Sequence, residues 1–182
     1  METFGERLHA AMGIRGALCV GIDPHASLLE AWGLGDDPAG LETFVMTCVE
    51  AFAGEMAVLK PQSAFFERHG SAGIAVLERF VVAARSAGAL VLLDAKRGDM
   101  DSTMQGYAEA YLLKSSPLAV DAITLNPFLG FESLRPALDA AHANGTGVFV
   151  LALTSNPEGP QFQSAAAREG GTVAGAVLAE NG

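Results

Sequence analysis

Cysteine, tryptophan and basic residues are scarce in this sequence. The 182 residues include two cysteines, one tryptophan, and 11 lysines and arginines against 21 aspartates and glutamates, which gives a net charge of −10. Binding to nucleic-acid phosphates needs a basic face, so we expect no nucleic-acid partner. Cys19 and Cys48 lie in apolar runs and show no pairing pattern, which predicts two buried thiols in a reducing cytoplasm.

Long hydrophobic runs and several common catalytic motifs are also missing. No apolar stretch reaches the length of a membrane-spanning helix, and the opening METFGERLHAAM does not form a secretory signal. The chain has no G-x-S-x-G, no P-loop and no G-x-G-x-x-G after a strand. The four histidines lack metal-ligand spacing. We therefore expect no membrane association, no hydrolase, NTPase or dinucleotide chemistry, and no metal site.

What the sequence does contain is a regular alternation of strand-like and helix-like segments. Half of the residues are hydrophobic and 21 are glycine, which is typical of an α/β domain. Helical patterns separate short apolar runs, so we expect right-handed βαβ units and a parallel sheet. Five continuous apolar runs predict strands buried on both faces, at 17–22, 56–59, 89–93, 121–125 and 147–153.

Each expected strand ends at a polar residue: Asp23, Lys60, Asp94, Asn126 and the Thr154–Ser155 pair. In a (β/α)8 barrel such ends form one rim that carries the active site, whereas an open doubly wound sheet binds a ligand only at its switch point. Five polar ends favour the barrel. A complete barrel has eight strands in about 250 residues. We therefore expect residues 1–182 to form a single α/β domain, a (β/α)8 TIM barrel truncated after the fifth strand and its following helix, with strands six to eight absent.

The segment DAKRGD, residues 94–99, places opposed charges directly after the third apolar run. Asp94 and Lys96 are two residues apart, so in an extended strand they point to the same side, and Lys60 ends the neighbouring strand. Asp99 follows in the loop. A Lys–Asp–Lys–Asp chain is then possible in which every charge has an opposite neighbour. The competing interpretation is an ordinary salt-bridge cluster, which the position of these charges at strand ends disfavours.

The sequence resembles the orotidine 5′-phosphate decarboxylase family, in its bacterial group with the D-A-K-R-G-D motif. The resemblance rests on CVGIDPH, VLKPQSAFFERHG, LLDAKRGD with Thr103, TLNPFLGFESL and LALTSNPEG, in that order. It implies a TIM barrel that forms a homodimer with shared active sites. It also implies a carbon–carbon lyase that converts orotidine 5′-phosphate to UMP and CO2, the last step of de novo pyrimidine nucleotide synthesis, without cofactor or metal.

The resemblance implies catalytic roles for residues of the charged cluster. Lys96 is the proton donor to the C6 carbanion that forms when CO2 leaves. Asp94 lies beside the departing carboxylate, and Lys60 links the ribose to the charge network. Asp99 reaches into the active site of the partner subunit.

The resemblance also implies a set of substrate-binding residues. Asp23 binds the ribose hydroxyls, together with Lys60. Ser155 recognises the pyrimidine, and Thr103 reaches the partner subunit's site beside Asp99. The glutamine and arginine with which the family grips the substrate phosphate have no counterpart in this chain.

Two other functions stay open at this point. One is a magnesium-dependent lyase of the same D-x-K-x-x-D suprafamily that acts on a sugar phosphate. Such relatives place an acidic metal ligand at the end of the second strand, where this chain has Lys60, and a cation there would repel Mg²⁺. The other is a non-catalytic fragment that only folds or associates, which the three missing barrel strands keep open.

Overall fold

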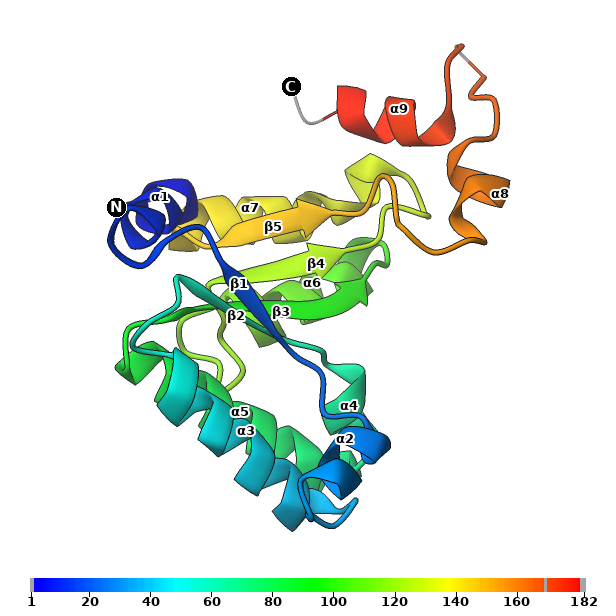
Figure 1. Ribbon diagram of the computed structural model, residues 1–182. Coiled ribbons are helices and arrows are strands. Elements are labelled where there is room, and N and C mark those ends of the chain that lie inside the picture. Colours follow the sequence, from blue (N-terminus) through cyan, green and yellow to red (C-terminus); the bar gives the residue numbers. More distant parts are fainter. Residues whose placement is uncertain (1, 169, 181–182) are drawn as a thin grey trace.

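The computed structural model describes residues 2–168 and 170–180 of the chain. Within them, five parallel strands form one sheet whose spatial order, β1-β2-β3-β4-β5, is also their order along the chain (Figure 1). A doubly wound sheet would reverse this order at a switch point. The barrel-type arrangement is therefore confirmed. The strands are β1 (Cys19–Ile22), β2 (Val58–Pro61), β3 (Leu90–Arg97), β4 (Ala122–Leu125) and β5 (Gly147–Val150).

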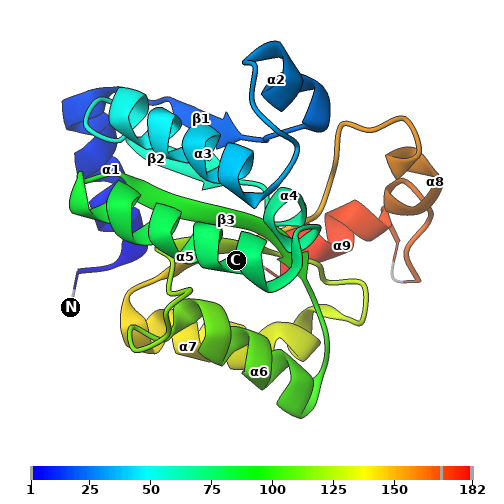
Figure 2. The same cartoon turned by 90° about the horizontal axis from the view of Figure 1, so that it is seen from below.

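The helices are segregated around this sheet. Helices α3, α5, α6 and α7 cover one face, α1 lies at the amino ends of the strands, and α2, α4 and α8 lie at the carboxyl ends (Figures 1 and 2). The helices are α1 (Phe4–Arg15), α2 (Ala26–Ala31), α3 (Pro38–Phe52), α4 (Ala64–Glu67), α5 (Gly70–Ser86), α6 (Asp101–Leu112), the 3-10 helix η1 (Phe131–Leu134), α7 (Arg135–Asn144), α8 (Gly159–Gln163) and α9 (Val173–Ala179).

Local sequence signals explain where the main helices begin and end. Thr3 and Glu6 form a capping box at the start of α1, and Asp37 caps α3 with Pro38 in its first turn. Helix α7 ends at Gly145, which adopts the left-handed conformation at φ 67°. Within the described residues, no helix has both the length and the apolarity needed to cross a membrane.

Alternation along the strands gives the sheet two different faces. One set of side chains points outward into the large core formed with α3, α5, α6 and α7, and includes Leu59, Val91, Leu93, Ile123 and Leu125. The alternate set points inward. Val58, Leu92 and Ala122 of this set form its lower layer, a small apolar cluster that also contains Phe4 of α1 and Ala57, the residue before β2.

The polar residues lie one layer above that cluster on the same inner face. Lys60, Asp94 and Thr124 each follow a member of the apolar layer by two positions on their strand. They therefore lie toward the carboxyl ends of β2, β3 and β4, where barrels carry their active sites.

Two expectations from the sequence need correction. Strand β3 does not stop before Asp94 but continues through Arg97, where its pairing with β4 resumes at Leu125. Cys19 is exposed rather than buried: it lies on β1, the first strand of the described sheet, and has strand neighbours on one side only. Cys48 is buried as expected, and this burial raises the pKa of its thiol to about 11.

The packing of α1 against β5 gives a testable prediction. A Cβ on Gly147 would overlap the ring of Phe4, which also makes an edge-to-face contact with Phe149 at 6.0 Å between ring centroids. Gly147→Ala should therefore lower the free energy of unfolding of the full-length protein by about 1–3 kcal/mol. Gly13→Ala in α1 is the control, since its Cβ would meet nothing within 4 Å.

Phe4→Ala alone should cost about 3–5 kcal/mol, because it empties a buried aromatic site. The double variant should be less destabilised than the sum of the two single variants, since removing the ring makes room for the new methyl group. Urea unfolding measures the free energy of unfolding of the wild type and of each variant. Strict additivity would show that Phe4 does not occupy this position.

Candidate active site

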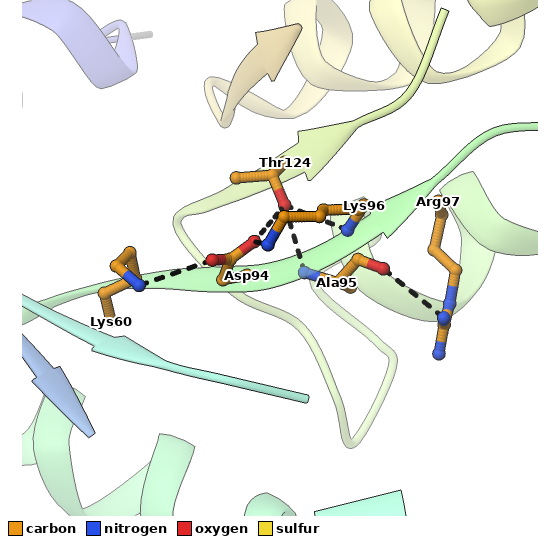
Figure 3. Close-up of polar contacts among 6 residues, drawn as sticks. All are labelled: Lys60, Asp94, Ala95, Lys96, Arg97 and Thr124. Atoms are coloured by element: carbon orange, nitrogen blue, oxygen red, sulfur yellow. Dashed lines mark hydrogen bonds and ion pairs between the residues drawn. The ribbon is translucent and has the colours of Figure 1, made fainter. Parts of the chain in front are cut away.

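The carboxylate of Asp94 lies at the centre of a charged cluster on the inner face of the sheet (Figure 3). Its Oδ2 accepts a hydrogen bond from Nζ of Lys60 at 3.3 Å. Its Oδ1 accepts from Nζ of Lys96 at 2.6 Å and from Oγ1 of Thr124 at 2.8 Å. The Asp94 side chain is 12% exposed, against 29% for Lys60 and 44% for Lys96. The Asp94 side chain is thus shielded, while both lysine side chains stay more accessible.

Burial alone would raise the pKa of Asp94, because it disfavours the charged form. The hydrogen bonds from Lys96 and Thr124, together with the charges of Lys96 and Lys60, outweigh this effect and hold the pKa below its ordinary value. Asp94 is therefore ionised at neutral pH, and each of its oxygens faces a cation.

Thr124 is a member of this site that sequence reasoning missed. Its hydroxyl donates to Asp94, and its oxygen accepts hydrogen bonds from the backbone N–H groups of Ala95 at 3.0 Å and Lys96 at 2.9 Å. The available signal was its position: it lies two residues before Asn126, the polar residue expected to end that strand, and so shares a face with it.

The backbone of β3 is irregular at the site. Leu93 pairs with Ile123 and Arg97 with Leu125, so four steps along β3 face two steps along β4. Lys96 adopts φ 49°, in the left-handed region that residues other than glycine rarely occupy. The predicted contact between Asp94 and Lys96 is present, but it is made across a bulge rather than along an extended strand.

Asp23 directly follows β1, the strand that pairs with β2. A Cβ on Gly21 would lie 3.0 Å from Oδ2 of Asp23, so its carboxylate folds back over Gly21. Gly21 is the register partner of Lys60 on β2. The structure thus places Asp23 on the Lys60 side of the cluster.

Asp99, Thr103 and Ser155 are not brought into the cluster. Oδ1 of Asp99 accepts a hydrogen bond from the N–H of Met100 at 2.9 Å, and Thr103 is exposed in the first turn of α6. Ser155 is exposed in the loop after β5. In the described part of the chain, these side chains make no hydrogen bond or ion pair with Lys60, Asp94 or Lys96. The predicted four-membered chain of charges is therefore present only as Lys60–Asp94–Lys96.

The remaining residues of the DAKRGD motif build the support of the site. Arg97 turns away from the cluster, pairs with Glu67 on α4 and lies 5.6 Å over the ring of Tyr107 on α6. A Cβ on Gly98 would overlap the backbone oxygen of Asn126. The arginine therefore ties two helices to β3, and the glycine permits close approach to the end of β4.

Fold and site together define a (β/α)-barrel protein whose charged cluster occupies the end of the barrel where such proteins hold their active sites. Residues 16–181 match the sequence model of the "Orotidine 5′-phosphate decarboxylase / HUMPS family". The chain belongs to this family.

Curated relatives and solved structures agree with the family assignment. The chain is 64% identical to the orotidine 5′-phosphate decarboxylase of Nocardioides sp., covering 98% of this chain and 66% of the relative. It is 62% identical to that of Streptomyces coelicolor, covering 98% of this chain and 64% of the relative. The chain thus spans just under two thirds of the length of these relatives.

Among solved structures, the chain superposes with a TM-score of 0.97 on a Streptomyces avermitilis protein assigned as an orotidine 5′-phosphate decarboxylase. The two are 62% identical, and the match covers 99% of this chain and 63% of that one. The Leishmania donovani OMP decarboxylase gives a TM-score of 0.79 at 31% identity, covering 96% of this chain and 63% of that one.

The lowered pKa of Asp94 predicts an acid-sensitive contribution to stability. Asp94 in the unfolded chain has its ordinary pKa of about 3.9, and in the fold its pKa is lower. Its contribution is therefore complete above the ordinary value and is lost as the pH falls toward the folded value, where the unfolded state binds the proton more tightly.

The free energy of unfolding of the full-length protein should accordingly fall more steeply below about pH 4 than that of its Asp94→Asn variant. Urea unfolding between pH 7 and pH 3 measures the difference between the two. Asp139→Asn, which removes an exposed carboxylate on α7, is the control and should follow the wild type. Parallel curves for wild type and Asp94→Asn would contradict the ionised, doubly paired state of Asp94.

Proposed function

We propose that the full-length protein is a carbon–carbon lyase that decarboxylates orotidine 5′-phosphate to UMP and CO2, the last step of de novo pyrimidine nucleotide synthesis. One observation carries the proposal: the shielded Asp94 carboxylate is paired with the ammonium groups of two more accessible lysine side chains, Lys60 and Lys96, in a chain of this family. The relatives from Nocardioides sp. and Streptomyces coelicolor bear the name of this enzyme.

The proposed reaction breaks the bond between C6 of the pyrimidine and its carboxylate carbon. CO2 leaves, and the bonding electron pair stays on C6 as a carbanion, which then takes up a proton to give UMP. Lys96 supplies a cation where this negative charge develops and afterwards donates the proton. Asp94 holds the Lys96 ammonium in position at 2.6 Å and, beside the substrate carboxylate, would favour its departure by charge repulsion.

Substrate binding is assigned to residues around this pair. The position of Asp23 over Gly21, next to Lys60, supports a ribose site formed by Asp23 and Lys60. The exposed Ser155 after β5 is free to reach a bound pyrimidine. Binding energy from the distant parts of the substrate would then hold the reacting carboxylate against Asp94.

We propose further that the protein acts as a homodimer with shared active sites. Asp99 lies beyond the end of β3, and Thr103 lies exposed about one helical turn further on, so both can face a second subunit. Neither residue contacts the cluster of its own chain in the described residues, which is consistent with service in the site of the partner. A symmetric interface of this kind would contain two equivalent sites.

The proposed chemistry uses neither metal nor cofactor. The two ammonium groups beside Asp94 would repel a divalent cation, which disfavours the magnesium-dependent alternative. We also propose that residues 1–182 belong to one barrel domain, which the continuous sheet supports, and that the protein is cytoplasmic.

Loss of Lys96 provides the direct test of this function. The full-length Lys96→Ala variant should lose kcat by about 10²–10⁴-fold or more, because it lacks both the cation and the proton donor. Its KM and its affinity for UMP should change little. The absorbance change on decarboxylation gives the rate.

The control variant is Lys114→Ala, which removes a lysine from the loop before β4, at the opposite end of the barrel, and should retain wild-type kcat. Wild-type activity should survive EDTA. Unchanged kcat with raised KM in Lys96→Ala would refute the role of Lys96. Loss of wild-type activity on chelation and its recovery with Mg²⁺ would instead support the metal-dependent alternative.

Mixing two inactive variants tests the shared site. Full-length Lys96→Ala and Asp99→Ala subunits should each be nearly inactive alone. In a mixed dimer one site carries both lesions, while the other has an intact Lys96 from one chain and an intact Asp99 from its partner. With random exchange, half of the dimers are mixed and about a quarter of all sites are restored.

Subunit exchange is verified by fluorescence transfer between labelled chains, and each variant mixed with itself is the control. If proven exchange recovers no activity, Asp99 acts within its own chain and the shared-site proposal is wrong.

A further inference from the structure

The hydroxyl of Thr124 uses all of its hydrogen-bonding positions within the proposed active site. A hydroxyl has one donor and two acceptor positions. Here the donor is used on Oδ1 of Asp94 at 2.8 Å, and the oxygen accepts from the N–H groups of Ala95 at 3.0 Å and Lys96 at 2.9 Å. Thr124 is 8% exposed, so few water molecules compete for these positions.

These contacts compensate for the bulge in β3. Between the paired positions Leu93 and Arg97, the strand contains two more residues than the facing part of β4. The N–H groups within such a bulge lose their regular acceptors on the neighbouring strand. The Thr124 oxygen takes the place of these acceptors for two successive N–H groups, and the ladder resumes where the N–H of Asn126 donates to the carbonyl of Arg97 at 2.7 Å.

The same oxygen therefore constrains both members of the catalytic pair. Through the N–H of Lys96 it fixes the left-handed bend at φ 49°, from which the Lys96 side chain starts. Through the donated hydrogen bond it fixes the Asp94 oxygen that receives the Lys96 ammonium. Oγ1 of Thr124 thus holds both the backbone from which the Lys96 side chain starts and the carboxylate that binds the Lys96 ammonium group (Figure 3).

We propose that Thr124 is a positioning residue for the proposed decarboxylation: its hydroxyl sets the geometry of the Asp94–Lys96 pair by holding the bulge and the carboxylate together. This inference rests on the proposed function and adds to it a residue that acts through Asp94 and Lys96. The Asp94 carboxylate faces two charged groups, Lys60 from β2 and Lys96 from β3. Thr124 from β4 is its uncharged partner.

The test compares three variants of the full-length protein. Thr124→Val keeps the shape of the side chain but leaves the N–H groups of Ala95 and Lys96 and one Asp94 oxygen without this partner. Thr124→Ala removes the same hydroxyl with less steric change, and Thr124→Ser retains it. Thr146→Val is the matched control, because the Thr146 hydroxyl is buried without a hydrogen-bond partner in the described part of the chain.

We expect kcat to fall on the order of 10²-fold in Thr124→Val and Thr124→Ala, with KM little changed, since a small displacement of a reacting group has this effect. Thr124→Ser and Thr146→Val should stay close to wild type. The acidic limb of the kcat profile should move to higher pH in Thr124→Val, because Asp94 loses a hydrogen bond that favours its ionised form.

Thermal unfolding of each variant separates positioning from stability. If Thr124→Val does not fold, the comparison of Thr124→Ala with Thr124→Ser decides. An active wild type with unchanged kcat and an unmoved acidic limb in the variants without the hydroxyl would overturn this inference alone, as would a Thr124→Ser variant as impaired as Thr124→Ala. An inactive wild type would overturn the proposed function and this inference with it.

Discussion

The compensation of one buried negative charge governs the architecture of this site. A carboxylate that is largely removed from water is costly unless cations and hydrogen-bond donors replace its hydration. Asp94 obtains Lys60 from β2, Lys96 from its own strand and Thr124 from β4. Because these partners come from three strands, the charge can be satisfied only when the strands lie side by side in this order. The fold and the electrostatics of the site therefore depend on each other.

The barrel supplies that arrangement through its two-residue alternation. Val58, Leu92 and Ala122 close the lower layer of the inner face with Phe4, and the polar residues stand two positions further along the same strands. The apolar layer excludes water from below, which strengthens the interactions of the ammonium groups with Asp94. Gly98 lets the loop after β3 approach Asn126, so the motif leaves the site without opening the sheet.

The parts of the site that follow strand periodicity could be predicted from the sequence. Lys60, Asp94 and Lys96 lie at strand ends at the right spacing, and their contacts are present. The bulge could not be predicted, because DAKR has the spacing of an ordinary extended strand and nothing in it signals a left-handed lysine. Thr124 was missed for the same reason: its importance depends on N–H groups that the bulge leaves free. Ser155 and Asp99, whose proposed roles involve a substrate or a second chain, make no hydrogen bond or ion pair with the cluster in the described part of the chain, so the structure offers no contact that reveals such roles.

The bulge and its threonine fit the demand that the proposed reaction places on Lys96. A free lysine has a pKa of about 10.4, and a carbanion on a pyrimidine carbon is a far stronger base, so proton transfer is downhill once that carbanion forms. The carbanion is short-lived, however, and the proton must already lie within reach of C6 when CO2 leaves. A lysine on an ordinary strand end would sample many rotamers, whereas one with a fixed backbone bend and an anchored ammonium group samples few. The strained left-handed backbone of Lys96 and its hydrogen bond to Asp94 thus serve to place the ammonium group, which is what the proposed proton transfer requires.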